Sequence, residues 1–335
     1  MTDALAQQGR ESIEAGSKSF ALASKVLPPR IRDDASMLYA WCRYCDDVID
    51  GQEMGHGQIA DYRDGQGERL GILLERTRNA LIVPPAPTRA GAQIDAQAVA
   101  SKLDPDMGRD ERVDGIFRGM AVVFERNAVP HRHAFELLRG FEMDAAERTY
   151  RTTDDILDYS YHVAGVVGVM MAMIMGVRDD PTLDRASDLG LAFQLTNIAR
   201  DVIDDARAGR VFVPQELLLK HGAPVEPDLL MQPQNWRAAH EAAVELLDVA
   251  EGYYASARTG IRHLPFRCAW AITAALKVYR EIGEVLRRGG PEAWQDRVGA
   301  GTGRKLALAM MAGGPAMVRA RAKDAPRDGF YARPL

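Results

Sequence analysis

The segment from Gln194 to Asp205 constrains the fold more than any other stretch. It contains no glycine or proline over twelve residues, and its apolar side chains recur at helical spacing, which predicts an α-helix. Steps of three and four residues return to the same helix face. The polar residues on that face are Gln194, Asn197, Asp201, and then Asp204 or Asp205. Carboxylates four residues apart repel each other by roughly 0.2–0.5 kcal/mol per pair in an isolated helix, so this stripe needs a partner such as a divalent cation.

A second acidic cluster lies far upstream. Asp46 and Asp50 are one helical turn apart, with Asp47 beside them, and Arg43 precedes them as Arg200 precedes the downstream cluster. Each cluster is a D-x-x-x-D at the C-terminal end of an apolar helical stretch. One such motif alone is typical of a solvated helix face. Two of them, each flanked by arginine and by apolar residues, favour a functional interpretation.

Helical patterns dominate the whole chain, and alternating β-branched runs are nearly absent. The ranges predicted as helices are 31–50, 68–81, 113–127, 131–144, 153–175, 180–207, 234–261, 264–289 and 304–311. A short helical stretch is expected from residue 16 to 26, and another helix from Pro214. The proline-rich stretch 84–114 is predicted to be mostly a long loop. With no linker and no repeat of 20–50 residues, one all-α domain over residues 1–335 is expected, with a frayed or disordered tail beyond Pro315.

Composition excludes several classes of protein. The chain is 47% hydrophobic and 27% charged, which is ordinary for a globular protein, and its net charge of −5 argues against nucleic-acid binding. The polar start lacks a secretory leader and the cysteines number three, so a cytoplasmic location is expected. Residues 163–177 carry no charge but are too few for the ~20 that span a bilayer. A core helix is the favoured interpretation, and peripheral contact with a membrane stays open.

Paired carboxylates suit Mg²⁺ or Mn²⁺, hard cations that take oxygen ligands and are often shared with substrate phosphates. Departure of a diphosphate uses two such carboxylate sets, because the metals offset the charge on the leaving oxygens. Arg43, Arg200 and Arg210 would add charge-assisted hydrogen bonds to phosphate. The allylic carbocation left behind could be stabilised by aromatic rings. Candidate rings are Phe20, Tyr39, Tyr159 and Tyr279, although each alone is more typical of a core residue.

These residues resemble the squalene/phytoene synthase family, and among its members the bacterial phytoene synthases of carotenoid biosynthesis. The resemblance covers roughly residues 16–305. Its blocks, in family order, are Gly16–Phe20, Leu38–Arg43 with Asp46–Asp50, Tyr159–Gly165, and Gln194–Pro214. It implies a single-domain, all-α prenyl-transferase (isoprenoid synthase) bundle around a central cavity, with the two aspartate motifs facing each other at its mouth.

The resemblance also assigns roles to residues. The implied metal ligands are Asp46, Asp47, Asp50, Asn197, Asp201 and Asp205. The implied substrate contacts are Ser17, Phe20, Tyr39, Arg43, Tyr159, Gln194, Asn197, Arg200, Arg210 and Tyr279. The implied catalytic set is Tyr39, Arg43, Asp46, Asp50, Tyr159, Asp201 and Asp205. The implied cofactors are two or three Mg²⁺ or Mn²⁺ ions that bridge diphosphate, without NADPH.

The implied reaction joins two geranylgeranyl diphosphates head to head through a cyclopropyl diphosphate to phytoene, with release of both diphosphates. The implied partners are this substrate, neighbouring carotenoid-pathway enzymes and a membrane surface, but no nucleic acid. A C15-using squalene or dehydrosqualene synthase is the main alternative, because Ser24 and Ser36 are equally well read as space for a C20 chain or as helix-surface residues. A terpene cyclase or a non-catalytic assembly protein of the same fold is a more distant alternative.

Overall fold

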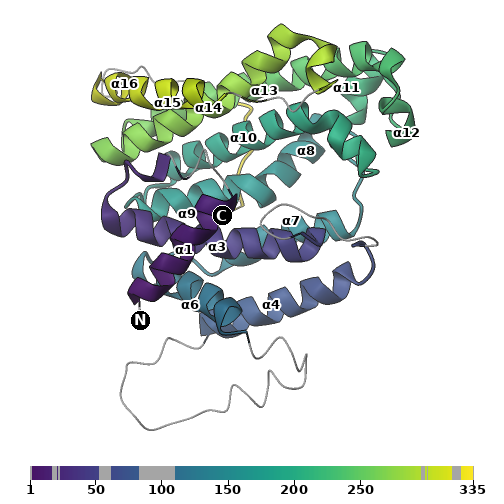
Figure 1. The fold of residues 1–335 in the computed structure, drawn as a ribbon. Helices are drawn as coiled ribbons and strands as arrows, with labels where there is room; N and C mark the ends of the chain where they lie inside the picture. Colours follow the sequence, from purple (N-terminus) through teal and green to yellow (C-terminus); the bar gives the residue numbers. More distant parts are fainter. Residues whose placement is uncertain are drawn as a thin grey trace, which may run out of the picture. The chain divides into compact units, whose positions relative to one another are not determined.

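The computed structural model describes residues 2–16, 21, 23–52, 62–82, 110–295, 299, 301–318 and 326–334. Within these residues every regular element is a helix, which confirms the predicted all-α class (Figure 1). Contacts divide the chain into two compact units: Met1–Ala21 with Pro29–Ala145, and Leu22–Pro28 with Ala146–Leu335. A single domain over residues 1–335 stays a prediction.

The first unit is organised around α3 (Pro29–Asp50), which packs against the other four helices of the unit. These are α1 (Thr2–Gly16), α4 (Gln66–Ile82), α6 (Glu111–Arg126) and α7 (Arg132–Ala145). Trp41 and Cys45 on α3 are fully buried. Asp34, also fully buried, accepts hydrogen bonds from Arg126 at 2.6 Å and Asn127 at 3.0 Å, so the buried charge is paired where α3 meets α6.

The second unit is organised around α10 (Asp180–Arg207), which packs against α13 (Trp236–Ile261), α14 (Phe266–Gly289) and α9 (Val166–Ile174). The other elements are α8 (Thr153–Ser160), η2 (Tyr161–Gly165), α11 (Gln215–Lys220), α12 (Pro227–Leu230), η3 (Pro233–Asn235), η4 (Pro291–Gln295), α15 (Thr302–Met311) and α16 (Gly313–Val318). A Cβ on Gly190 would lie 2.3 Å from the carbonyl oxygen of Ala164, so only glycine lets η2 approach α10 this closely.

Local sequence signals fix the ends of these helices well. The bounds of α10 coincide with the predicted 180–207, because Asp179 caps the start by accepting the backbone N–H of Thr182 at 3.0 Å. The predicted helix over 153–175 is instead interrupted by the π-helical turn η2. The amino-terminal helix α1 was not predicted. Most of the 84–114 loop lies outside the described residues, and α6 already begins at Glu111 within it.

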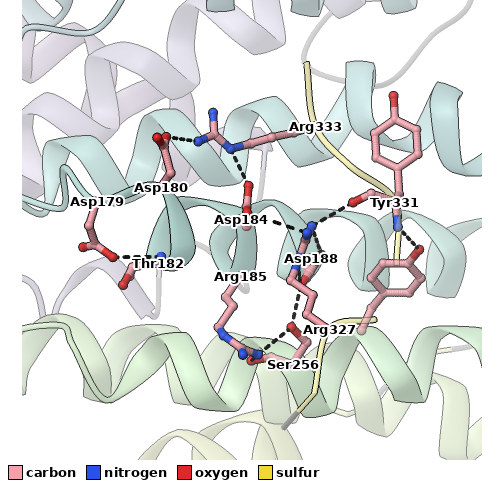
Figure 2. Close-up of polar contacts among 11 residues, drawn as sticks. Asp179, Asp180, Thr182, Asp184, Arg185, Asp188, Ser256, Arg327, Tyr331 and Arg333 are labelled. Atoms are coloured by element: carbon pink, nitrogen blue, oxygen red, sulfur yellow. Dashed lines mark hydrogen bonds and ion pairs between the residues drawn. The ribbon is translucent and has the colours of Figure 1, made fainter. Parts of the chain in front are cut away.

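The predicted frayed tail beyond Pro315 is wrong for two segments. Residues 313–318 form α16, and residues 326–334 lie against α10 and α13, held by ion pairs of Arg327 and Arg333 (Figure 2). These contacts join residues more than a hundred positions apart, which local patterning does not reveal.

One stretch, Thr153–Ile174, is long and apolar enough to cross a membrane by length and composition, with a mean hydropathy of 1.3. Of its most apolar 18-residue window, 67% is buried inside the protein. Such burial is typical of a core helix, which is the interpretation that the sequence favoured for residues 163–177.

Candidate active site

The first acidic cluster lies on the last two turns of α3. Arg43 Nη1 donates a 2.6 Å hydrogen bond to Asp46 Oδ2 and lies 3.9 Å from Asp47 Oδ1. Asp46 keeps 39% of its side-chain surface exposed, whereas Asp47 keeps 11%. Asp50 is half-buried. Asp46 and Asp50 are therefore the accessible carboxylates of this motif, and Asp47 lies deeper, beside the arginine.

The carboxyl group of Asp46 is unusually basic. Desolvation is the largest cause that raises its pKa, Arg43 opposes the shift, Asp50 and Asp47 add to it, and together these effects raise the pKa to about 7. Although 39% of its side-chain surface is exposed, the Asp46 carboxyl is desolvated on the sides that protein atoms surround. Like charges crowded at a poorly solvated position are a signature of functional sites and favour binding of a cation.

The end of α3 is held in a fixed geometry. Gly51 has a positive φ of 60°, and the N–H of Gln52 bonds to the carbonyl of Asp47 at 2.9 Å, which is the Schellman pattern. Arg69 Nε donates to the carbonyl of Val48 at 2.8 Å, and Gln66 donates to the carbonyl of Ile49 at 3.0 Å. A cation at a helix C-terminus also complements the helix dipole.

The second acidic cluster forms the predicted polar stripe on α10. Gln194, Asn197, Arg200, Asp201 and Asp205 are half-buried, whereas the residues that alternate with them face the core. These core residues include Leu195, Ile198, Ala199, Val202 and Ile203. The helix therefore presents an accessible polar face from an otherwise buried position.

Two carboxylates of this cluster have different environments. Arg200 Nε donates to Asp201 Oδ1 at 2.6 Å and Nη2 donates to Oδ2, a two-pronged ion pair. Asp204 is 63% exposed and pairs with Arg207 at 2.6 Å. Asp204 therefore lies on the solvent side of α10, and Asp205 is the residue that continues the stripe.

The end of α10 brings Arg210 back toward this stripe. Gly209 has a φ of 73°, its N–H bonds to the carbonyl of Ala206 at 2.9 Å, and the N–H of Arg210 bonds to the carbonyl of Asp205 at 2.8 Å. These two bonds complete a second Schellman motif. Desolvation and the charge of Asp201 raise the pKa of Asp205 well above its ordinary value, while Arg210 acts in the opposite direction.

Aromatic rings form two clusters in the second unit. Phe212 stacks on Tyr150 and on Tyr159 with ring centroids 5.8 and 5.3 Å apart, and the two tyrosine rings lie tilted to each other at 5.1 Å. The Arg210 guanidinium lies 4.7 Å from the Phe212 ring. Phe193 stacks on Tyr279 at 4.1 Å. Tyr279 is close enough to Arg200 to interact with it electrostatically, which puts this second cluster beside the polar stripe. The sequence did not indicate Tyr150, Phe212 and Phe193, because no spacing signal marks a ring that stacks across elements.

The remaining predicted residues divide between the described and undescribed parts of the chain. Tyr39 lies one turn before Arg43, whose guanidinium is 5.9 Å from the ring centroid, and burial raises the pKa of the tyrosine. Ser17 and Phe20 lie outside the described residues. Whether the two acidic motifs face each other depends on the placement of the two units and stays a prediction.

The donor sets fit a hard divalent cation. Among the described residues, no three His, Cys, Asp or Glu side chains converge on one point as a ready-made cage. Magnesium is commonly held by only one or two carboxylates together with substrate phosphates, and each motif offers two accessible carboxylates. The Oδ1 atom of Asn197, on the polar face one turn before Asp201, is buried and has no hydrogen-bond partner in the described structure. A bound cation or its water would satisfy this oxygen.

A sequence profile of the squalene/phytoene synthase family matches residues 13–304. The chain belongs to this family. The match covers both acidic motifs and every site residue named above. The family predicted from the sequence motifs is confirmed.

Three bacterial relatives named 15-cis-phytoene synthase align with this chain over nearly their whole length. The protein of Paracoccus sp. (strain N81106 / MBIC 01143) is 46% identical over 97% of this chain and 96% of its own length. The protein of Enterobacter agglomerans is 43% identical over 96% of this chain and 100% of its own. The protein of Pantoea ananas is 42% identical over 97% and 96%.

Solved structures agree on the fold. A dehydrosqualene synthase in complex with ligand superposes with a TM-score of 0.75 at 24% identity, over 95% of this chain and 98% of its own. The squalene synthase HpnC from Alicyclobacillus acidocaldarius superposes with a TM-score of 0.66 at 21% identity, over 86% and 95%. The predicted all-α isoprenoid synthase fold is thereby confirmed.

Proposed function

We propose that this protein is a 15-cis-phytoene synthase, which joins two geranylgeranyl diphosphates and releases two diphosphates without NADPH. The observation that carries this proposal is the identity of 42–46%, over nearly the full chain, to relatives of that name. Two intact aspartate motifs, each with its arginine, supply the chemistry. A non-catalytic protein of the same fold would have no use for carboxylates kept accessible and poorly solvated.

Mg²⁺ or Mn²⁺ is the proposed cofactor. Asp46 and Asp50 would hold it on α3, and Asp201, Asp205 and the Asn197 oxygen would hold it on α10. When bound, the metal would neutralise the negative charge of the departing diphosphate. Asp47 is mostly buried beside Arg43, so we assign it to orienting the arginine rather than to direct ligation.

The arginines would bind the diphosphate, and the aromatic rings would stabilise the carbocation. Arg43, Arg200 and Arg210 carry fixed positive charge at the ends of both motifs and would bind phosphate oxygens. The rings of Tyr159 and Tyr279 lie in stacked clusters that exclude water and present π-electron density to a carbocation. Gln194 extends the same polar face toward the start of α10.

The main alternative keeps the chemistry and shortens the substrate to a C15 diphosphate. One observation is compatible with this alternative: the solved structures of similar fold include a dehydrosqualene synthase and the squalene synthase HpnC. Ser24 and Ser36 are both buried, at 7% and 1% exposure, so neither is the helix-surface residue of the alternative reading. Competition between C15 and C20 diphosphates distinguishes the two substrate lengths.

The proposal is tested by incubating the purified protein with geranylgeranyl diphosphate and Mg²⁺. A C40 hydrocarbon should form without NADPH, and chelation of the metal should stop its formation. A cyclic C20 product would identify a terpene cyclase instead. If diphosphate bound without metal and without turnover, the non-catalytic alternative would hold.

We also propose that the protein docks peripherally on an anionic membrane through α15 and α16. Four large apolar side chains on these helices are 48–73% exposed: Leu306, Met310, Met311 and Met317. Residues 297–323 contain six arginines and lysines and no acidic residue, in a chain whose net charge is −5. Exposed apolar side chains on helices that basic residues flank in the sequence fit a lipid surface with negative headgroups, where a C40 hydrocarbon product would also dissolve.

Flotation with vesicles tests this surface. The protein should float with vesicles that contain phosphatidylglycerol, and the Met310→Ser/Met311→Ser variant should float several-fold less. Leu219→Ser is the matched control, because Leu219 is 64% exposed on α11 in a different part of the unit. Equal flotation of all three proteins would reject this surface.

A further inference from the structure

Residues 326–334, here called the C-terminal strap, run along α10 and α13 (Figure 2). Arg327 donates to both carboxylate oxygens of Asp188, at 2.9 and 3.0 Å, and to the carbonyl of Tyr331 at 2.7 Å. Arg333 donates to Asp184 at 2.7 Å and also to Asp180. Arg333 is 1% exposed at its side chain, and Asp188 is fully buried. The strap is thus built into the fold.

The strap neutralises a third acidic stripe, at the amino-terminal half of α10. Asp180, Asp184 and Asp188 recur every four residues, so they share one helix face and repel one another. Burial raises the pKa of Asp188, and Arg327 together with Ser256 acts in the opposite direction by donating hydrogen bonds. A buried carboxylate of this kind needs its arginine.

The middle of the strap is anchored next to the candidate active site. The hydroxyl of Tyr331 donates to Asp158 Oδ1 at 3.1 Å, and its ring packs on Tyr161 at 5.6 Å between centroids. Its backbone N–H donates to the hydroxyl of Tyr253 at 3.1 Å. Asp158 and Tyr161 flank Tyr159 on either side in sequence. The strap therefore contacts the residues next to Tyr159, which packs with Tyr150 and Phe212.

The turn that the strap contacts, η2, has an unfavourable local geometry and depends on contacts with other elements. Tyr161–Gly165 forms a π-helical turn, and such turns are rare, cost free energy and occur frequently at functional sites. Asp158 is also held by Arg148 at 2.9 Å. His162 Nδ1 lies 2.8 Å from the Asp158 carbonyl oxygen. These contacts hold the residues on either side of Tyr159 and the start of the π-helical turn.

We propose that the C-terminal strap is a positioning element, in which Tyr331 clamps the π-helical turn and so orients Tyr159 toward the substrate. This inference rests on the proposed function, since Tyr159 is assigned there to the substrate site. Tyr331 itself acts through Asp158 and Tyr161. Its loss should therefore alter turnover and product quality more than substrate affinity.

The test compares Tyr331→Phe, which keeps the ring contact, with Tyr331→Ala, which loses both contacts. Arg207→Gln is the matched control, because its ion pair lies on the exposed side of α10. Hydrogen–deuterium exchange of the 153–165 segment should accelerate in both Tyr331 variants and most in Tyr331→Ala, and it should be unchanged in the control. With geranylgeranyl diphosphate, kcat should fall roughly 10- to 100-fold with little change in KM, and more C20 alcohol from water capture should appear.

The exchange measurement is independent of the reaction. If the wild-type protein makes no C40 hydrocarbon, the proposed function fails, while faster exchange in the variants still supports the clamp. If exchange in 153–165 stays at the wild-type rate in Tyr331→Ala, the clamp is rejected. If exchange accelerates but kcat and the product ratio per folded molecule are unchanged, the strap is structural only and the positioning role is rejected.

Discussion

Arg200 donates two hydrogen bonds, from Nε and Nη2, to the carboxylate of its sequence neighbour Asp201. Arg43 holds Asp46 from one turn away in the other motif. In both motifs an arginine therefore neutralises the first aspartate. A metal ion that enters must share or displace that arginine, which would free the guanidinium to bind the diphosphate that arrives with the metal.

Asp201→Asn should abolish most of the activity while the fold persists. Metal-ion stabilisation of a leaving group is worth several kcal/mol, so kcat should fall by about 100-fold or more. The ion pair is partly exposed and its loss should cost only about 0–1 kcal/mol of unfolding free energy. Turnover of geranylgeranyl diphosphate and urea unfolding measure the two effects.

Asp204→Asn is the control for that experiment. Asp204 lies on the same helix but is 63% exposed and forms an ion pair with Arg207 on the solvent side. Its activity should stay within about twofold of wild type, as for surface substitutions away from a site. Equal losses in the two variants would contradict the assignment of the polar stripe.

Asn197→Leu should separate stability from metal binding. The buried Oδ1 atom has no partner in the described structure, and such a group costs about 1–3 kcal/mol. Its removal should leave the metal-free protein as stable as wild type or more so. The Mg²⁺ concentration for half-maximal activity should rise roughly tenfold or more. Asn197→Asp, which keeps the oxygen, should retain metal affinity; a loss of affinity as large as that of Asn197→Leu would show that the oxygen is no ligand.

The raised pKa of Asp46 predicts a pH effect of defined sign. Because its pKa in the folded protein is about 7, the folded state keeps a proton that the unfolded state releases between about pH 4 and pH 7. This group therefore makes the metal-free protein less stable as pH rises through that window. The stability of Asp46→Asn relative to wild type should increase from pH 4.5 to pH 8 in chelator. Parallel stability curves for the two proteins would contradict the shift.

Arg69→Met should loosen the end of the first motif helix. Its guanidinium donates to the carbonyls of Val48 and Asp64, at 2.8 and 2.7 Å. Loss of charge-assisted hydrogen bonds should lower the free energy of unfolding by about 1–3 kcal/mol. Arg78→Met, exposed on the same helix, should stay within about 0.5 kcal/mol of wild type. Urea denaturation checks both, and indistinguishable midpoints would mean that Arg69 adds nothing to this helix end.

Local patterning anticipated much of the second unit. The apolar spacing, Asp179 before the helix and Gly209 after it determine α10, so its bounds and its polar stripe were both predictable. The helix period also indicated that only one of Asp204 and Asp205 would lie on the same face as Asp201. Burial decided between them, because Asp204 lies on the solvent side.

Features that depend on contacts between distant residues escaped prediction. The π-helical turn shifts the register by one residue, which a helical apolar pattern tolerates without a visible break. The ring of Phe212 stacks on Tyr159 from a loop that has no periodicity. The strap pairs Arg327 with Asp188 across 139 residues, and its nine residues have no apolar pattern of their own. Each of these is a tertiary effect.

The most direct test of the proposed function supplies equal amounts of farnesyl and geranylgeranyl diphosphate with Mg²⁺ and without NADPH, and determines the mass of the hydrocarbon formed. We expect a C40 product with the mass of phytoene as the main species, and its disappearance in Asp46→Asn and Asp201→Asn. A C30 product as the main species, or a C40 product that persists in both variants, would contradict the proposal.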